Sequence, residues 1–103
     1  MSLSKKFLKS KPVCKVTFTL PGEIANGAKK VGLIGEFNDW NIKKPIAMKA
    51  LKNGSFKATV DLETGKSYQF RYLVDGSTWQ NDDQADAYVP TGVSDEENSV
   101  VEV

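Results

Sequence analysis

The sequence contains no histidine and only one cysteine. Without histidine, the usual zinc sites and the Ser–His and Cys–His nucleophile arrangements are excluded. Because Cys14 has no second cysteine to pair with, an intramolecular disulfide is excluded as well. Cys14 lies on the apolar side of an alternating segment, which predicts a small buried hydrophobe rather than a reactive thiol. We expect neither a metal nor a cofactor.

Long apolar runs are also missing. The longest fall far short of a bilayer crossing, and residues 1–12 carry no apolar stretch long enough for a secretory signal. With 40% apolar and 26% charged residues over 103 positions, the composition is that of one ordinary globular domain. We therefore expect a cytoplasmic location and no membrane partner.

Basic residues are absent from the last part of the chain. Residues 1–71 hold all 14 lysines and arginines against five acids, a net charge of +9, whereas residues 72–103 hold eight acids and no base, a net charge of −8. This asymmetry is compatible with a basic partner-binding half. We favour attraction between the two halves of one sandwich, because no dense basic helix or arginine cluster is present, and we expect no nucleic-acid partner.

Alternation of apolar and polar residues is the strongest pattern that is present. Cys14, Val16, Phe18 and Leu20 alternate with more polar neighbours, which predicts a strand with one wet face. Similar segments recur at intervals of roughly ten residues, separated by turn residues, without helical periodicity. We predict an all-β, immunoglobulin-like β-sandwich of about seven strands and no helix. The clearest expected strands are residues 13–20, 30–34, 46–51, 56–62, 67–75 and 98–103, with residues 80–97 as an acidic loop.

Residues 1–12 are rich in lysine and serine and end at Pro12. They are interpreted as a tail or at most one helical turn. The folded domain is expected to comprise residues 13–103.

Two tryptophans follow predicted strand ends. Asn38 and Asp39 predict a tight turn that holds Trp40 at a fixed angle beyond its strand, and Trp79 follows another turn. An indole offers a flat apolar surface with polarised edges, which suits stacking on the apolar face of a sugar ring. The alternative is that one or both tryptophans close an end of the sandwich.

Polar side chains accompany the tryptophans. Gln69 and Arg71 share the face of strand 67–75 that lies opposite an aromatic row, and Asn98 opens the last strand. Each can exchange hydrogen bonds with sugar hydroxyls, Arg71 through a rigid fork of donors. Taken singly, each also fits a solvated outer face or a loop end.

Other site chemistries find little support. The acidic segment 81–86 lacks the glycine and the terminal glutamate of a calcium loop. So small a sandwich is expected to lack the deep cleft in which paired carboxylates catalyse. No helix is predicted that a phosphate loop could precede. We expect a chain that is not an enzyme.

Four motifs carry a family resemblance. They are Gly35-Glu36-Phe37-Asn38-Asp39-Trp40, Tyr68-Gln69-Phe70-Arg71-Tyr72-Leu73-Val74-Asp75-Gly76, Trp79 with Asn81-Asp82, and Asn98-Ser99-Val100-Val101. Through them, residues 13–103 resemble the family 48 carbohydrate-binding modules. These include the N-terminal early-set domain of isoamylases and glycogen branching enzymes, and the glycogen-binding domain of the β subunit of AMP-activated protein kinase.

The resemblance implies an early-set sandwich that binds α-1,4-glucan, as glycogen, starch or maltodextrin, without catalysis. By position, Trp40 and Trp79 match the two stacking tryptophans, while Arg71 and Asn98 match residues that bond sugar hydroxyls. Gln69 joins this candidate carbohydrate-binding set because it shares the strand face of Arg71. The expected partners are an α-glucan oligosaccharide or polysaccharide and a glycogen- or starch-metabolising enzyme.

The sequence departs from the kinase subunit at two places. Ser77-Thr78 makes the turn before Trp79 one residue longer, and Ser94-Asp95-Glu96-Glu97 replaces a mixed apolar and polar loop that clasps the glucan. The alternative is therefore a protein-interaction or packing module with a degenerate sugar site, similar to the N-terminal domain of amylase-family (glycoside hydrolase family 13) enzymes. The amylase-family catalytic barrel needs about 250 residues, which this chain cannot contain.

Overall fold

Ten strands, one α-helical turn and one 3-10 turn are found in residues 3–92 and 96–103, the part of the chain that the computed structural model describes. In chain order they are β1 (Leu3–Phe7), β2 (Val13–Leu20), α1 (Gly22–Ala25), β3 (Val31–Gly35), η1 (Glu36–Asn38), β4 (Ile46–Ala47), β5 (Lys49–Ala50), β6 (Phe56–Glu63), β7 (Ser67–Val74), β8 (Thr78–Gln80), β9 (Ala87–Pro90) and β10 (Glu97–Glu102).

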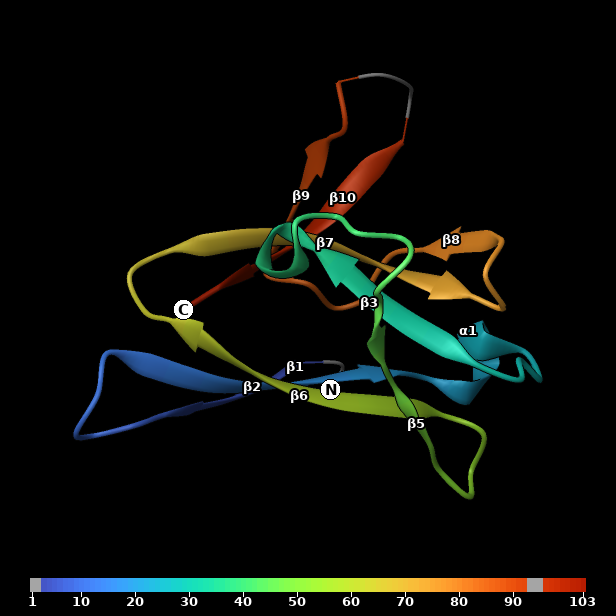
Figure 1. Cartoon of the computed structure of the whole chain (residues 1–103), viewed down its shortest axis with the longest axis horizontal. Coiled ribbons are helices and arrows are strands. Elements are labelled where there is room, and N and C mark those ends of the chain that lie inside the picture. Colours follow the sequence, from blue (N-terminus) through green and yellow to red (C-terminus); the bar gives the residue numbers. More distant parts are fainter. Residues whose placement is uncertain (1–2, 93–95) are drawn as a thin grey trace.

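The strands form two stacked antiparallel sheets (Figure 1). One sheet has the order β1-β2-β6-β5, and the other has the order β4-β3-β7-β10-β9 with β8 also paired to β7. We call them the first and the second sheet. Each buries the apolar side of its alternating strands, so that Phe18 of β2 meets Phe70 of β7 edge to face, with ring centroids 5.0 Å apart. The predicted immunoglobulin-like sandwich is confirmed, and Cys14 is buried in it as predicted.

The N-terminal segment is a strand, so its interpretation as a tail or helical turn was wrong. β1 pairs with β2 in a register that runs from Leu3 opposite Phe18 to Phe7 opposite Cys14. The Leu3 side chain is buried, and Lys5 forms a 2.6 Å ion pair with Asp86, which precedes β9 of the second sheet. This strand was not predicted, because the charged Lys5 interrupts a very short pattern of apolar residues.

Other differences between the predicted and the observed strands come from strands too short to show an alternation of apolar and polar residues. The expected strand 46–51 is split between the sheets: β4 pairs with β3, β5 pairs with β6, and the buried Met48 lies between them. The expected loop 80–97 contains β9 and the end of β8. These short strands raise the number from about seven to ten.

The prediction of no helix was wrong by one turn. α1 begins directly after its N-cap Pro21 and ends at Ala25, where the C-cap Asn26 has the left-handed conformation that commonly terminates a helix. Neither of the two helical turns in the described residues is long and apolar enough to cross a membrane.

Deleting residues 1–8 tests the role of β1. The deletion removes the buried Leu3 side chain, worth about 2 kcal/mol, and the partly buried Lys5–Asp86 pair, worth about 1 kcal/mol. We expect the free energy of unfolding in urea to fall by about 2–3 kcal/mol. The control Lys9→Ala, in the turn after β1, should leave it unchanged. An unchanged unfolding midpoint after the deletion would show that β1 contributes nothing to stability and would contradict this prediction.

Candidate functional site

The outer face of β7 is the base of the candidate site. Side chains alternate along this strand: Phe70 and Tyr72 are fully buried between the sheets, whereas Gln69 and Arg71 point to the other side and stay partly exposed. β3 lies along one edge of β7, and β8 and β10 lie along the other. Residues from the neighbouring strands and loops can therefore meet above Gln69 and Arg71.

The loop after β3 holds Trp40 by local hydrogen bonds. Asn38 Oδ1 accepts from the Gly35 N–H at 2.9 Å, and the Trp40 N–H donates to the Gly35 carbonyl at 2.9 Å. Asp39 and Trp40 both have left-handed backbones, with φ of 57° and 55°. Such conformations cost non-glycine residues about 1–2 kcal/mol each, so the closed turn must impose them. Trp40 directly follows this hydrogen-bonded turn and is partly exposed.

Gly35 allows this loop to lie directly on β7. A Cβ at this position would lie 2.5 Å from the Gln69 carbonyl oxygen and 2.8 Å from Phe70 Cβ, closer than atoms can approach. In the same place, Glu36 Oε1 accepts from the Gln69 N–H at 2.6 Å. Glycine is therefore required for the loop that carries Trp40 to pack against the strand that carries Gln69.

Trp79 lies inside β8 and not in a loop past a strand end. Its register partner on β7 is Leu73, which brings the indole beside Arg71, with the guanidinium carbon 5.7 Å from the ring centroid. At this distance the cation and the ring attract each other. The chain enters this paired strand at Thr78, directly after Ser77, and the pairing holds Trp79 beside Arg71.

Arg71 is mostly occupied by contacts within the protein. Its Nη2 donates to Glu96 Oε2 at 3.0 Å, and both Nε and Nη2 donate to the Glu97 carbonyl at 3.2 Å. The Arg71 side chain is only 11% exposed, whereas that of Glu96 is 64% exposed. Arg71 therefore ties Trp79 to the start of β10, and Nη1 is its one nitrogen without a hydrogen-bond partner among the described residues. Of the acidic segment 94–97, residues 94 and 95 lie outside those residues.

Asn98 and Gln69 form a pair on the floor of the site. Asn98 Nδ2 donates to Gln69 Oε1 at 3.0 Å, and both side chains are partly exposed. Each amide thus keeps its second polar atom for another partner, a donor on Gln69 and an acceptor on Asn98.

All five predicted residues line one shallow hollow of about 480 Å³. Three residues that were not predicted as site residues complete its lining. The lining consists of Glu36, Trp40, Gln69, Arg71, Trp79, Thr91, Glu96 and Asn98. The signal for Glu36 was present, since it stands in the same motif as Trp40. Nothing local marks Thr91, which reaches the hollow only through the pairing of β9 with β10.

A buried polar network supports β8 and β10 from beneath. Asp82 is only 1% exposed and accepts from the Tyr72 hydroxyl at 2.6 Å, while its N–H donates to Ser99 Oγ at 2.8 Å. Asn81 accepts from both the N–H and the hydroxyl of Ser99 and donates to the Glu97 carbonyl. The segment expected as part of an acidic loop is therefore structural at these two positions. Burial, reinforced by the Asp82 carboxylate, raises the pKa of Tyr72.

Comparison with protein families gives one match. The model described as "Glycogen recognition site of AMP-activated protein kinase" matches residues 16–103. Comparison with curated proteins gives no match.

Comparison with solved structures gives similar folds. Crystal structures of the enterobactin esterase FES from Shigella flexneri match with TM-scores of 0.72 with 2,3-dihydroxy-N-benzoyl-serine and 0.71 with enterobactin. Both are 11% identical in sequence, and the match covers 99% of this chain but only 32% of the esterase. At this identity the likeness shows the fold alone, and the chain spans about a third of the esterase.

The Tyr72–Asp82 contact predicts a dependence of stability on alkaline pH. Because the fold raises the pKa of Tyr72, it binds the phenolic proton more tightly than the unfolded chain does. This stabilisation is complete below about pH 10 and is lost as the pH rises above that value. Between about pH 9 and pH 11, the free energy of unfolding should therefore fall more steeply in the wild type than in Tyr72→Phe.

Tyr68→Phe is the matched control, since the Tyr68 hydroxyl donates to an exposed backbone carbonyl, that of Glu63. Urea unfolding at a series of pH values should give this control the wild-type slope. Equal slopes for the wild type and Tyr72→Phe would contradict the raised pKa of Tyr72 in the folded protein.

Proposed function

Because the chain belongs to the family of the glycogen recognition site of AMP-activated protein kinase, we propose that it binds α-1,4-glucan at the hollow between Trp40 and Trp79. The ligand is a stretch of glycogen, starch or maltodextrin. The chain has no catalytic role in this proposal, and the two indoles supply the apolar contact. The observation that carries it is that both tryptophans and the Gln69–Asn98 pair line one hollow on a single sheet face.

The chemistry of the hollow supports a neutral, hydroxylated ligand. The two indoles offer flat apolar surfaces, which stack on sugar C–H faces and remove both from water. The free amide atoms of Gln69 and Asn98 both donate and accept, as vicinal hydroxyls require. Glu36 and Glu96 add carboxylate acceptors at the rim, while Arg71 chiefly positions Trp79 and offers only Nη1 to a hydroxyl.

The shape of the site supports weak, reversible binding. A shallow hollow buries little area for each sugar, so we expect dissociation constants in the micromolar to millimolar range. Such affinity suits a module that holds an enzyme near a polymer with many equivalent sites. We retain the cytoplasmic location as a prediction. The free, buried thiol of Cys14 is compatible with it, because the cytosol keeps thiols reduced.

A second candidate function, docking of an enzyme, is favoured by the outer face of the first sheet. Lys49 lies directly opposite Lys57, and Lys6 lies directly opposite Lys15. All four are exposed, and none forms an ion pair among the described residues. Like charges directly opposite each other destabilise a sheet. Lys15 also lies opposite Asp61 on β6, whereas no acid pairs with Lys49 or Lys57 among the described residues. The Lys49–Lys57 pair therefore supports the docking of an acidic surface, such as that of a glycogen- or starch-metabolising enzyme, on the sheet that does not carry the hollow.

Replacing one tryptophan tests the sugar site. In calorimetric titration with maltoheptaose, Trp40→Ala and Trp79→Ala should each weaken binding by about tenfold or more, because each removes one stacking surface. Phe7→Ala is the matched control, since Phe7 is 56% exposed but lies on β1, away from the hollow. Wild-type affinity in both tryptophan variants, with the fold intact by circular dichroism, would sink the proposal.

Reversing one lysine tests the second candidate. Lys57→Glu turns the like-charged Lys49–Lys57 pair into an attractive one, so the isolated domain should become slightly more stable, by less than about 1 kcal/mol. Urea unfolding at low salt measures the change, and high salt should reduce it. Loss of stability would show that the pair carries no repulsion and would remove the reason to infer a docking face.

A further inference from the structure

Two further hollows continue from the one between the tryptophans. The next hollow shares Arg71, Trp79 and Glu96 with it and extends past Gln80 to Ile24 of α1. A third hollow shares Asp83 with the second and includes Glu23, the neighbour of Ile24. Because neighbouring hollows share lining residues, the three follow one another from the outer face of the second sheet to α1. In Figure 1, α1 and β8 lie at the same end of the sandwich.

The second hollow combines apolar and polar groups. The Trp79 indole and the Ile24 side chain, both partly exposed, give it apolar surface. Gln80 adds a partly exposed amide, and Asp83 adds an exposed carboxylate. A sugar ring presents the matching combination, with apolar C–H faces and hydroxyls around its edge.

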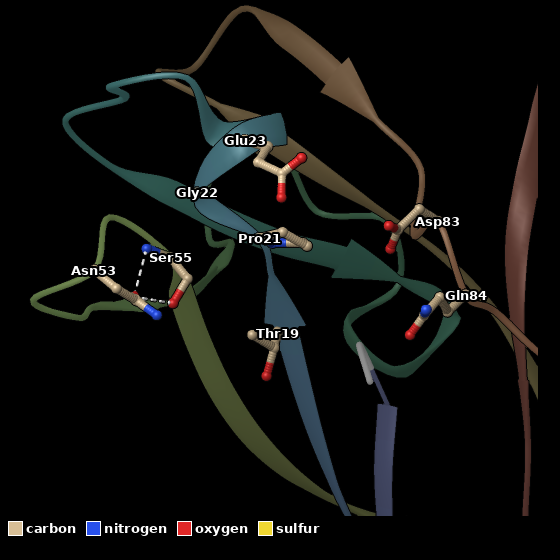
Figure 2. Close-up of a pocket in the computed structure, with 8 residues that line it drawn as sticks. All are labelled: Thr19, Pro21, Gly22, Glu23, Asn53, Ser55, Asp83 and Gln84. Carbon is tan, nitrogen blue, oxygen red and sulfur yellow. Dashed lines mark hydrogen bonds between the residues drawn. The ribbon is translucent and has the colours of Figure 1, made fainter.

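The third hollow, of about 450 Å³, is lined mainly by uncharged polar groups and carboxylates (Figure 2). In Figure 2, Asn53 and Ser55 lie at the left of it and Asp83 at the right, with Glu23 above and Thr19 below, between the two sides. Asn53 Oδ1 accepts from both the N–H and the hydroxyl of Ser55, at 3.1 and 2.6 Å, which fixes the Asn53 amide. No lysine or arginine lines this hollow. Groups of this kind bind hydroxyls and repel anions.

The geometry points to an extended binding track for one α-glucan chain, in which the second and third hollows hold the glucose units beyond those stacked on Trp40 and Trp79. This inference rests on the proposed function of the first hollow and adds a specificity to it. Short oligosaccharides fill the first hollow alone, whereas longer ones also contact Gln80 and Glu23. The chain therefore selects long stretches of α-glucan over short ones.

The test compares ligands of two lengths on the double variant Glu23→Ala with Gln80→Ala. Both side chains lie outside the first hollow, and Glu23 is exposed on α1. Calorimetric titration with amylodextrin should show a loss of affinity of about fivefold or more, the effect of two lost hydrogen bonds. Affinity for maltotriose should change by less than about twofold. Because a long chain offers many overlapping positions to one site, the comparison is made between protein variants on the same ligand and not between ligands.

Glu102→Ala, which removes an exposed carboxylate from β10 away from the three hollows, is the control and should retain both affinities. The single variant Glu23→Ala tests the third hollow alone and should show part of the amylodextrin loss. Equal affinity of the wild type and the double variant for amylodextrin, with maltotriose bound normally, would overturn the track and leave the proposed function standing. No binding of either ligand by the wild type would overturn both.

Discussion

The alternation of side chains along β7 is the constraint on which the rest of the structure depends. A strand sends successive side chains to opposite faces, so one stretch of eight residues supplies both the aromatic core and the floor of the site. Phe70 and Tyr72 pack and bond inward, whereas Gln69 and Arg71 face outward between β3, β8 and β10. A register slip of one residue would exchange the two sets and remove core and site together.

The fold was predictable wherever a strand was long enough to show its period. β2, β6 and β7 each have eight residues, and their patterns indicated both the strand and its buried face. β1 and β4 owe their existence to pairing with a neighbour and not to their own composition. Lys5 shows this most clearly, because its charge interrupts the pattern of β1, yet its amine reaches Asp86 beside the opposite sheet. Contacts of this range cannot be read from local sequence.

The site was predictable as a set of residues but not as a geometry. Motif positions indicated four of the side chains, and the strand face shared with Arg71 indicated Gln69. The sheet gathers all five in one hollow. The role of Arg71 was not readable in this way, since its bonds to Glu96 and Glu97 depend on where β10 begins. Asp82 illustrates the converse: an acidic residue in an apparent loop is buried against Tyr72, because β8 turns its chain back into the sandwich.

We propose different tasks for the two sheets, with sugar binding on the outer face of the second sheet and an acidic partner on the lysine-rich face of the first. The most direct test of the central claim is an NMR titration of the wild-type chain with maltoheptaose. We predict saturable shifts of the indole N–H signals of Trp40 and Trp79 and of the side-chain amides of Gln69 and Asn98. Shifts confined to the face of Lys15 and Lys57, or no shift at millimolar sugar, would contradict the account.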